Sequence, residues 1–357
     1  MALKALVAMS GGVDSTVAAF LAKQQGFDCA GITMKLFEHE DMASSREKPY
    51  GPLQNAQDAR AAAEALGIPH YTVNFTDDFA QEVIQRFVEA YLQGATPNPC
   101  IDCNRLIKFN RLLRKAQEFG MDYLITGHYA RIEHNRETGR YLLKKGLDES
   151  KDQSYALYAL TQDQLAQALF PLGMLHKSQV RSIAAAQGFL NADKPDSQDI
   201  CFVNTGDYAE FIERYTGLAA ESGNFLDMEG TVIGRHKGIL RYTIGQRRGL
   251  GISANKPLYV HSKNIADNTV TLSEDSRLFS EDCNATDFNW IAREPAESPI
   301  RIKAKIRYNQ TEQWAWAMQT SATTVHIQFD EAQRAITKGQ ALVLYDGDTV
   351  VGGGTIM

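Results

Sequence analysis

A glycine-rich turn near the N-terminus constrains this chain more than any other feature. The run Leu3 to Met9 is apolar apart from one lysine and predicts a buried strand, and Thr16 to Gln25 predicts a helix that stops at Gly26. The turn between them reads Ser-Gly-Gly-Val-Asp-Ser. Its backbone N–H groups and the positive end of the following helix would attract a phosphate group. Because no Gly-Lys-Ser/Thr follows the glycines, this is not a Walker A loop and it suits pyrophosphate better.

The hexapeptide resembles the loop of the ATP pyrophosphatases, enzymes that split ATP into AMP and pyrophosphate. The resemblance implies ATP as substrate with Mg²⁺ bound to it, Asp14 being available to the metal ion and Ser15 being a hydroxyl donor. The alternative is a plain glycine turn between strand and helix. The expected ATP-binding residues are Ala8, Met9, Ser10, Gly11, Gly12, Val13, Asp14, Ser15, Met34 and Gly127.

Composition and length exclude some classes of protein. A chain of 357 residues with 44% apolar residues can form two or three domains with buried cores. No run of 18 apolar residues predicts a membrane span, and no signal peptide precedes the first strand. Five scattered cysteines suggest reduced thiols in the cytoplasm. A net charge of −6 argues against a generally basic surface that binds nucleic acid, although a local basic stripe stays possible.

Strand and helix patterns divide the chain. Up to about residue 206, strands at 28–34, 70–74 and 122–126 alternate with helices at 55–66, 77–92 and 104–119, and 36–53 reads as a surface loop. This alternation predicts an α/β domain with a parallel sheet, in which ligands lie beyond the carboxyl ends of the strands. After about Gly217 short β-type runs prevail, at 230–233, 258–261, 269–272, 300–308, 313–318, 324–329 and 341–345. We expect domains at 1–206, 207–275 and 276–357.

Two cysteines lie between two of the predicted helices. Prolines fix an extended approach to Cys100, and Cys103 is expected at the start of the helix 104–119. There the helix dipole, with Lys108 nearby, would lower the pKa of the Cys103 thiol. The alternatives are half of a zinc site, a thioredoxin-like redox pair, and buried structural thiols. Cys201, flanked by Ile and Phe, would on its own more often be a core residue than a catalyst.

Several longer motifs follow the loop in one order. They are Asn-Pro-Cys-x-x-Cys-Asn, Thr-Gly-His-Tyr, Lys-Asp-Gln-Ser, Ser-Gln-Asp-Ile-Cys-Phe and Tyr-Thr-Ile-Gly-Gln-Arg-Arg-Gly-Leu-Gly. Together with the loop they resemble the tRNA-specific 2-thiouridylases of bacteria, over a span from Met9 to Tyr345. The resemblance implies an adenine-nucleotide α-hydrolase-like (PP-loop) domain, a small central β-rich domain and a C-terminal β-barrel.

The resemblance also implies a reaction and its residues. ATP would adenylate O2 of the wobble uridine in a tRNA anticodon, and a sulfur carrier protein or cysteine desulfurase would load Cys201 with a persulfide. Cys103 would act as the nucleophile, leaving a Cys103–Cys201 disulfide. Asn98, Pro99 and Cys100 would lie at the target base; some members carry an acid in place of Cys100, so an acid–base role there is in doubt. The tRNA-facing positions are His128, Lys151, Asp152, Gln153, Arg307, Tyr308 and Gln340.

A basic stripe is the candidate RNA surface. Along 300–308, Arg301, Lys303, Lys305 and Arg307 alternate with apolar residues, and no acid occurs from Ser298 to Thr311. On a strand the four cations would share one face. The alternative is a solvated strand face. Two rival functions also stay open: a PP-loop ATP pyrophosphatase that adenylates a small molecule, and an RNA-binding protein with a degenerate nucleotide loop.

Overall fold

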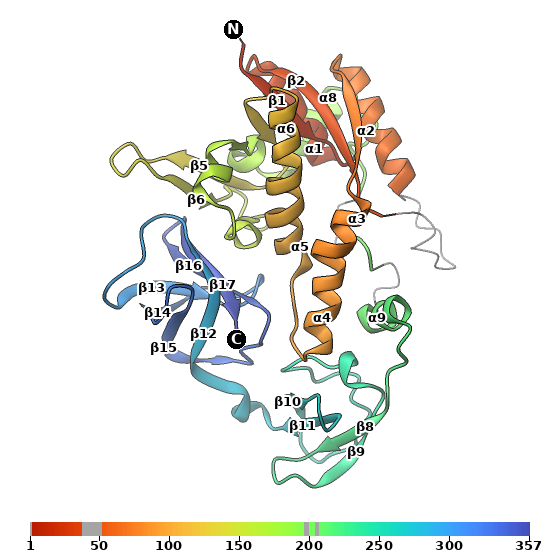
Figure 1. Ribbon diagram of the computed structural model, residues 1–357, viewed down its shortest axis with the longest axis vertical. Coiled ribbons are helices and arrows are strands. Elements are labelled where there is room, and N and C mark those ends of the chain that lie inside the picture. The colour runs from red at the N-terminus through yellow and green to blue at the C-terminus, as the bar shows by residue number, and fades with distance from the viewer. Residues whose placement is uncertain (1, 38–51, 196–199, 204–206) are drawn as a thin grey trace.

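A parallel sheet organises the first part of the chain. The computed structural model describes residues 2–37, 52–195, 200–203 and 207–357 (Figure 1). Five parallel strands lie in the order β3-β2-β1-β4-β7. Their bounds are β1 (Lys4–Ala8), β2 (Asp28–Lys35), β3 (His70–Asn74), β4 (Tyr123–Ile125) and β7 (Ala168–Leu169). The predicted α/β domain with a parallel sheet is confirmed.

Helices cover both faces of this sheet, as the strand pleat requires. Ala5 and Val7 of β1 point to one face and pack with α1 (Val13–Gln24), α2 (Pro52–Leu66) and α8 (Lys177–Ala186). Leu6, between them, points to the other face and joins a core that contains Phe79 and Phe109. That second face carries two long helices, built from α3 (Thr76–Phe79), η2 (Ala80–Gln85) and α4 (Arg86–Leu92), and from α5 (Pro99–Asp102), η3 (Cys103–Leu112) and α6 (Leu113–Glu118).

The second long helix begins five residues earlier than the sequence predicted. Pro99 occupies its first turn, and the Asn98 side chain caps it by accepting a hydrogen bond from the Cys100 N–H at 3.1 Å. Proline is common at this position because a backbone N–H there would have no hydrogen-bond partner within the helix, so its absence costs nothing. Helix η3 is π-helical, a wide-turned form that often occurs at functional sites. Cys103 therefore lies in the second turn of the helix, not at its start.

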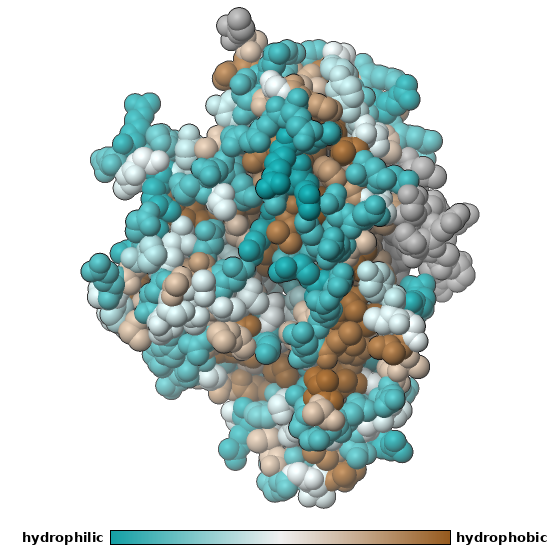
Figure 2. Space-filling model, in the orientation of Figure 1, coloured by the Kyte–Doolittle hydropathy of each residue, from teal (hydrophilic) through white to brown (hydrophobic). Residues whose placement is uncertain are grey.

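A small β domain follows α9 (Tyr208–Thr216). Its four strands pair in the order β10-β11-β8-β9 around the fully buried Phe225. Their bounds are β8 (Gly223–Leu226), β9 (Val232–His236), β10 (Tyr259–Asn264) and β11 (Thr269–Ser273). The turn between β10 and β11 meets the end of α4, since a Cβ built on Gly94 would lie 3.2 Å from the Ile265 side chain. Figure 2 shows apolar surface over this part of α4.

The C-terminal strands form a closed barrel. Strand β12 pairs antiparallel with both β15 and β17, so the ring β12-β15-β14-β13-β16-β17 has no free edge. The bounds are β12 (Phe279–Trp290), β13 (Ile300–Lys305), β14 (Gln313–Gln319), β15 (Val325–Arg334), β16 (Ala341–Asp346) and β17 (Thr349–Ile356). The predicted small central domain and C-terminal β-barrel are confirmed.

A hairpin from the first domain joins this barrel. Strands β5 (Ala130–His134) and β6 (Tyr141–Lys145) extend the sheet beyond β17, where Thr349 pairs with Lys144 and Val350 with Leu143 (Figure 1). The sequence analysis missed this hairpin and also β8, β12 and β17. Strand β17 carries three glycines, which lower strand propensity, but Gly353 is required because a Cβ there would lie 2.6 Å from the Tyr158 ring.

Short helices complete the chain. They are η4 (Ser154–Leu157), α7 (Gln162–Ala166), η5 (Pro171–Met174), η6 (Ile239–Arg241) and η7 (Asp275–Leu278). Most of the predicted surface loop 36–53 lies outside the described residues, as do residues 196–199 and 204–206. Within the described ranges, no helix combines the length and the apolar character that a membrane span needs.

Candidate active site

The loop of residues 9–15, which we name the phosphate loop, is held by hydrogen bonds within the loop and to β2. The Met9 N–H donates to the Ile32 carbonyl at 2.8 Å, and the Ser15 hydroxyl accepts from the Ser10 N–H at 3.1 Å and donates to the Gly12 carbonyl at 3.0 Å. Gly11 has φ +74°, and a Cβ there would lie 2.2 Å from the Asn55 carbonyl oxygen. Only glycine fits this position.

The helix after the loop begins at Val13, three residues before the predicted start, so Val13, Asp14 and Ser15 belong to its first turn. Their N–H groups are among those that a helix start leaves available to an anion. Gly127, just beyond β4, packs against this turn: a Cβ there would lie 2.9 Å from the Ser15 nitrogen. Met34 lies half-buried near the end of β2. The expected ATP-binding residues therefore gather at one edge of the sheet.

Asp14 has partners that the sequence analysis did not find. The Lys177 ammonium lies 2.7 Å from each Asp14 carboxylate oxygen, and the Tyr129 hydroxyl donates to Oδ1 at 2.7 Å. Lys177 begins α8, and its backbone N–H donates to Asp148 at 2.9 Å. Since Lys177 is 163 residues from Asp14, no local pattern could have indicated this pair.

A second lysine contacts the loop at Gly11. The Lys194 ammonium donates to Asp58 at 2.6 Å, to Asn55 at 2.8 Å and to the Gly11 carbonyl at 3.3 Å. The Asn191 amide donates to the same carbonyl at 3.2 Å. The segment before Cys201 is thus fastened to the phosphate loop.

Cys100, Cys103 and Cys201 form what we name the thiol cluster. Burial raises the pKa of the Cys100 and Cys103 thiols, and the nearby charge of Lys108 lowers it only in part. The predicted lowering of the Cys103 pKa by a helix start is therefore wrong, because Cys103 lies one turn too far into the helix. Cys100, rather than Cys103, occupies the first turn of this helix.

Cys201 belongs to this cluster although it is 98 residues from Cys103. It lies at the surface, but the protein around its sulfur raises the pKa of the thiol to about 12, helped by the charges of Cys103 and Cys100. The neighbouring Phe202 ring anchors the segment against Phe79 and Phe87, at 5.8 and 5.3 Å between ring centroids. All three cysteines are free thiols.

His128 is the most enclosed of the expected tRNA-facing residues. Its Nδ1 lies 2.6 Å from the Thr126 hydroxyl, and its ring packs against Phe109 and Phe170. Burial, with a smaller effect of Lys108, lowers the pKa of His128 well below its ordinary value. The imidazole is therefore neutral at physiological pH.

The other expected tRNA-facing residues line the contact between barrel and first domain. The Tyr308 hydroxyl donates to the Asp152 carbonyl at 2.8 Å, and the Gln340 amide donates to the Thr96 carbonyl at 2.6 Å. Gln153 exchanges hydrogen bonds with the Tyr129 backbone, and Lys151 is half-buried beside it. The Cys100 charge raises the pKa of Tyr308, after burial and Asp152, so this contact borders the thiol cluster.

The basic stripe has the predicted alternation, but it is not free of acids. Ile302, Ala304 and Ile306 point into the barrel core. Arg301 is paired with Asp330 of β15 and lies over the rings of Trp314 and Trp316, 5.0 and 5.5 Å from their centroids. Arg307 donates to the Ala335 carbonyl. Strand β15, which lies beyond β14 in the sheet, supplies the acid that residues 298–311 lack.

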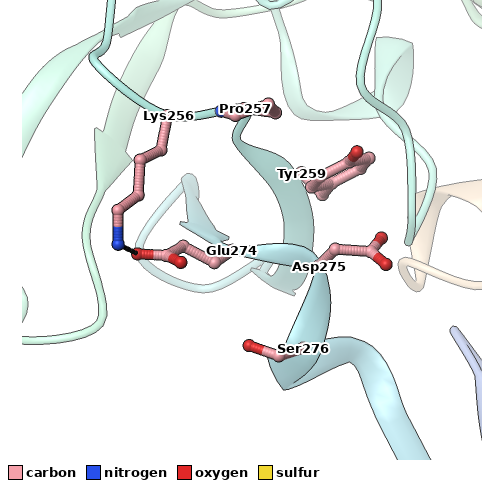
Figure 3. A pocket seen from close by; sticks show the side chains of 6 residues that line it. All are labelled: Lys256, Pro257, Tyr259, Glu274, Asp275 and Ser276. Atoms are coloured by element: carbon pink, nitrogen blue, oxygen red, sulfur yellow. Dashed lines mark hydrogen bonds and ion pairs between the residues drawn. The ribbon is translucent and has the colours of Figure 1, made fainter.

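Two hollows in the described structure are lined by none of the expected site residues. In the residues that the structure describes, no three His, Cys, Asp or Glu side chains gather to hold a metal ion. A hollow of about 270 Å³ lies between the small β domain and η7 (Figure 3). The Lys256–Glu274 ion pair crosses it at 2.7 Å, and none of the expected site residues lines it.

Comparison with known proteins identifies the family. Family models match three stretches: the "tRNA methyl transferase HUP domain" at 3–205, the "tRNA methyl transferase PRC-barrel domain" at 209–274 and the "Aminomethyltransferase beta-barrel domain" at 280–356. The chain is 49% identical to a tRNA-specific 2-thiouridylase MnmA of Clostridioides difficile, over 99% of this chain and 98% of that protein. The chain belongs to the tRNA-specific 2-thiouridylase family.

Further relatives of this 2-thiouridylase chain agree. The MnmA proteins of Acetivibrio thermocellus and Clostridium acetobutylicum are 47% and 46% identical, each over 99% of both chains. A solved 4-thiouridine synthetase–RNA complex with bound ATP matches 59% of this chain and 50% of its own, at 18% identity and a TM-score of 0.35.

Proposed function

We propose that this 2-thiouridylase replaces the O2 oxygen of a tRNA wobble uridine by sulfur, with cleavage of ATP to AMP and pyrophosphate. The observation that carries this proposal is the meeting of Cys201 with Cys103 and Cys100, from distant parts of a chain that relatives named tRNA-specific 2-thiouridylase match over nearly its full length. An enzyme that adenylates a small molecule has no need of such a cluster.

The first step makes the uracil oxygen a leaving group. O2 attacks the α-phosphorus of ATP, the bond from that phosphorus to the bridging oxygen breaks, and its electron pair leaves with pyrophosphate. The N3 proton of the uracil passes to water, which leaves a neutral O2-adenylated base. Helix N–H groups of the phosphate loop would bind the phosphates, and the Asp14 carboxylate offers the hard oxygen ligands that suit Mg²⁺.

The second step delivers sulfur. A persulfide on Cys201 attacks C2 through its terminal sulfur, and AMP leaves with the C2–O electron pair. The Cys103 thiolate then attacks the Sγ of Cys201, so the base keeps the terminal sulfur and a Cys103–Cys201 disulfide forms. The terminal sulfur is reduced and the two thiols are oxidised. A dithiol reductant restores them, and a sulfur carrier protein or cysteine desulfurase reloads Cys201.

The target base and its tRNA would enter beside the contact between barrel and first domain. Asn98 and Pro99 directly precede Cys100 of the thiol cluster there, and we propose all three as contacts of the target base. The positions carried over as tRNA-facing are His128, Lys151, Asp152, Gln153, Arg307, Tyr308 and Gln340. The wobble base would have to leave its stack in the anticodon loop to reach the thiols. We place the reaction in the cytoplasm, where thiols stay reduced.

One experiment tests this proposal directly. The protein is incubated with ATP, Mg²⁺, sulfide and unmodified tRNA, and the digested tRNA is analysed by mass spectrometry. Sulfide is already at the oxidation level of the thiouridine sulfur, so it attacks the adenylated C2 directly, AMP leaves, and no persulfide on Cys201 is needed. We expect 2-thiouridine, with AMP and pyrophosphate in equal amounts. Release of ADP and phosphate, or sulfur at another base, would contradict the proposal.

A further inference from the structure

Two tryptophans lie on the outer surface of the barrel, and no step of the proposed reaction needs them. Trp314 and Trp316, which we name the tryptophan platform, are two residues apart on β14, so their side chains project from the same face of the sheet. They are 49% and 47% exposed, whereas Ala315 between them is fully buried. Large aromatic side chains are mostly buried in proteins, so two neighbouring exposed rings indicate a binding surface.

The neighbouring strand places cations beside these rings. Strand β13 pairs with β14 so that Arg301 lies opposite Trp316, and its guanidinium lies over both rings, 5.0 and 5.5 Å from their centroids (Figure 1). Lys303 lies opposite Trp314, with its ammonium 5.3 Å from the ring centroid. Because Asp330 accepts a hydrogen bond from Arg301 at 2.6 Å, the guanidinium is held over the rings.

From this arrangement we propose that the tryptophan platform stacks on unpaired bases of the bound tRNA. The inference rests on the proposed function, because it takes tRNA as the substrate. A nucleotide joins a flat base to a negatively charged phosphate, so it complements an exposed ring with a cation beside it. An apolar protein surface would cover the rings but would leave the charges of Lys303 and Lys305 without a complement, so the combination favours RNA.

The tryptophan platform is continuous with the expected tRNA contact. Lys305 follows Lys303 by two residues on β13, about 7 Å along the strand, and its ammonium lies 5.8 Å from the centroid of the Tyr308 ring. The Tyr308 hydroxyl in turn donates to Asp152, in the contact that borders the thiol cluster. An RNA strand that leaves the target base along these cations would therefore pass the two rings.

Stacking and phosphate binding respond differently to salt. A phosphate contact releases counter-ions, so it steepens the fall of affinity with salt concentration. Stacking of an uncharged base on an indole ring releases none. The tryptophan platform should therefore contribute the same factor to the affinity at every salt concentration, whereas the lysines of the stripe set the slope. This difference separates the proposal from a purely electrostatic surface.

The test measures binding of unmodified tRNA to the full-length protein, without ATP or a sulfur donor, by filter binding at several salt concentrations. Trp314→Leu/Trp316→Leu keeps apolar side chains but removes the aromatic faces, and Trp314→Phe/Trp316→Phe keeps aromatic rings. We expect the leucine pair to weaken binding about tenfold or more with an unchanged salt slope, and the phenylalanine pair to lose less than threefold. Equal losses in the two pairs, or no loss in the leucine pair, would overturn the proposal.

An exposed aromatic residue elsewhere supplies the matched control. Tyr71 of β3, at the edge of the parallel sheet, is 46% exposed. Tyr71→Leu should change tRNA affinity less than twofold, and a loss as large as that of the leucine pair would overturn the proposal. So would a leucine pair that keeps its RNA affinity but loses a dimer that the wild type forms in sedimentation, because the face would then bind a second copy of the chain.

Tryptophan fluorescence detects the stacking itself. The third tryptophan, Trp290, is 9% exposed and donates to Gln319 at 2.7 Å, so it remains as an internal reference in the phenylalanine pair. A single-stranded oligouridylate should quench the emission of the wild type but not that of the phenylalanine pair. Duplex RNA of the same length should quench much less, because its bases are stacked on one another, and equal quenching would overturn the proposal.

Formation of 2-thiouridine by the wild type is measured separately. A wild type that binds tRNA and is quenched by oligouridylate, yet forms no 2-thiouridine, would contradict the proposed function alone. A leucine pair that binds tRNA as the wild type does would contradict this inference alone.

Discussion

The phosphate loop and the thiol cluster lie in the same domain but are built in opposite ways. The loop is a continuous stretch whose conformation follows from two glycines and a helix start, with Gly11 closed against Asn55. The cluster joins residues 100–103 to residue 201, and its electrostatics follow from burial and from one shared cation, Lys108. The local sequence can predict a site that is built from one segment. A site that is built from two segments depends on tertiary packing, which the local sequence does not reveal.

The largest expected effect concerns the loop. Asp14→Ala should lower the formation of AMP and pyrophosphate by about 100-fold or more, since it removes the carboxylate that is proposed to hold the metal ion and that pairs with Lys177. The measurement is release of labelled AMP in the presence of tRNA. Circular dichroism should show an intact fold, and near wild-type turnover would contradict the role of Asp14.

The second prediction separates the thiols from the loop. Cys103→Ser and Cys201→Ser should each lose at least about 100-fold in thiolation with a protein sulfur donor, while AMP formation persists, because adenylation precedes sulfur transfer. Cys201→Ser should keep some activity with free sulfide.

The matched control is Cys100→Ser, which should retain most thiolation. Cys100 has the position at the helix start, capped by Asn98, that the sequence analysis assigned to Cys103. The expectation that Cys100 is dispensable is therefore a stricter test than the sequence suggested. A collapse equal to that of Cys103→Ser would point to a dithiol or zinc site and would remove the persulfide mechanism.

Much of the fold was predictable because it is written in local patterns. The helix pattern at 77–92 matches the continuous helix from α3 to α4, and the run 70–74 matches β3. Strand β17 was missed because its glycines lower the strand propensity, and Gly353 is required there because a Cβ would clash with the Tyr158 ring. In the site, Lys177 and Lys194 were missed for a related reason: an ion pair between residues far apart in the sequence produces no periodic sequence pattern.

The third prediction uses pH to probe the cluster. With a pKa of about 12, the Cys201 thiol is almost entirely protonated at pH 7, and its thiolate fraction rises tenfold per pH unit. Site-resolved alkylation by iodoacetamide should therefore accelerate steadily from pH 7 to pH 10. A rate that is half-maximal near pH 8.5 and levels off above about pH 9.5, as for an unperturbed thiol, would show that the protein around the Cys201 sulfur does not raise its pKa.

Lys108→Met sharpens this measurement. The Lys108 charge lowers the pKa of all three thiols, so its removal should raise each pKa and slow alkylation at a given pH. Lys115→Met on α6 is the matched control, because Lys115 is paired with Glu118 at 2.8 Å and is not among the charges that shift these thiols. Equal rates in the two variants would contradict the shared-cation account.

The smallest expected effect concerns the basic stripe, where local pattern and long-range partner again disagree. Four alternating cations predict a phosphate-binding face, but Arg301 is engaged by Asp330 and Arg307 by a carbonyl. An RNA phosphate would therefore displace the fewest existing contacts at Lys303 and Lys305, although burial lowers the pKa of Lys305.

Each phosphate contact contributes about 0.7–0.9 to the slope of log affinity against log salt. Neutralising all four residues should therefore flatten the slope for tRNA binding by at most about 1.8, as measured by filter binding across salt concentrations, and Lys303→Gln/Lys305→Gln alone should account for nearly all of it. A change near 3 would show that all four residues bind phosphate and that Arg301 exchanges Asp330 for RNA. An unchanged slope would reduce the stripe to a solvated strand face, and the tRNA would then be held by the residues around Tyr308 and Gln340.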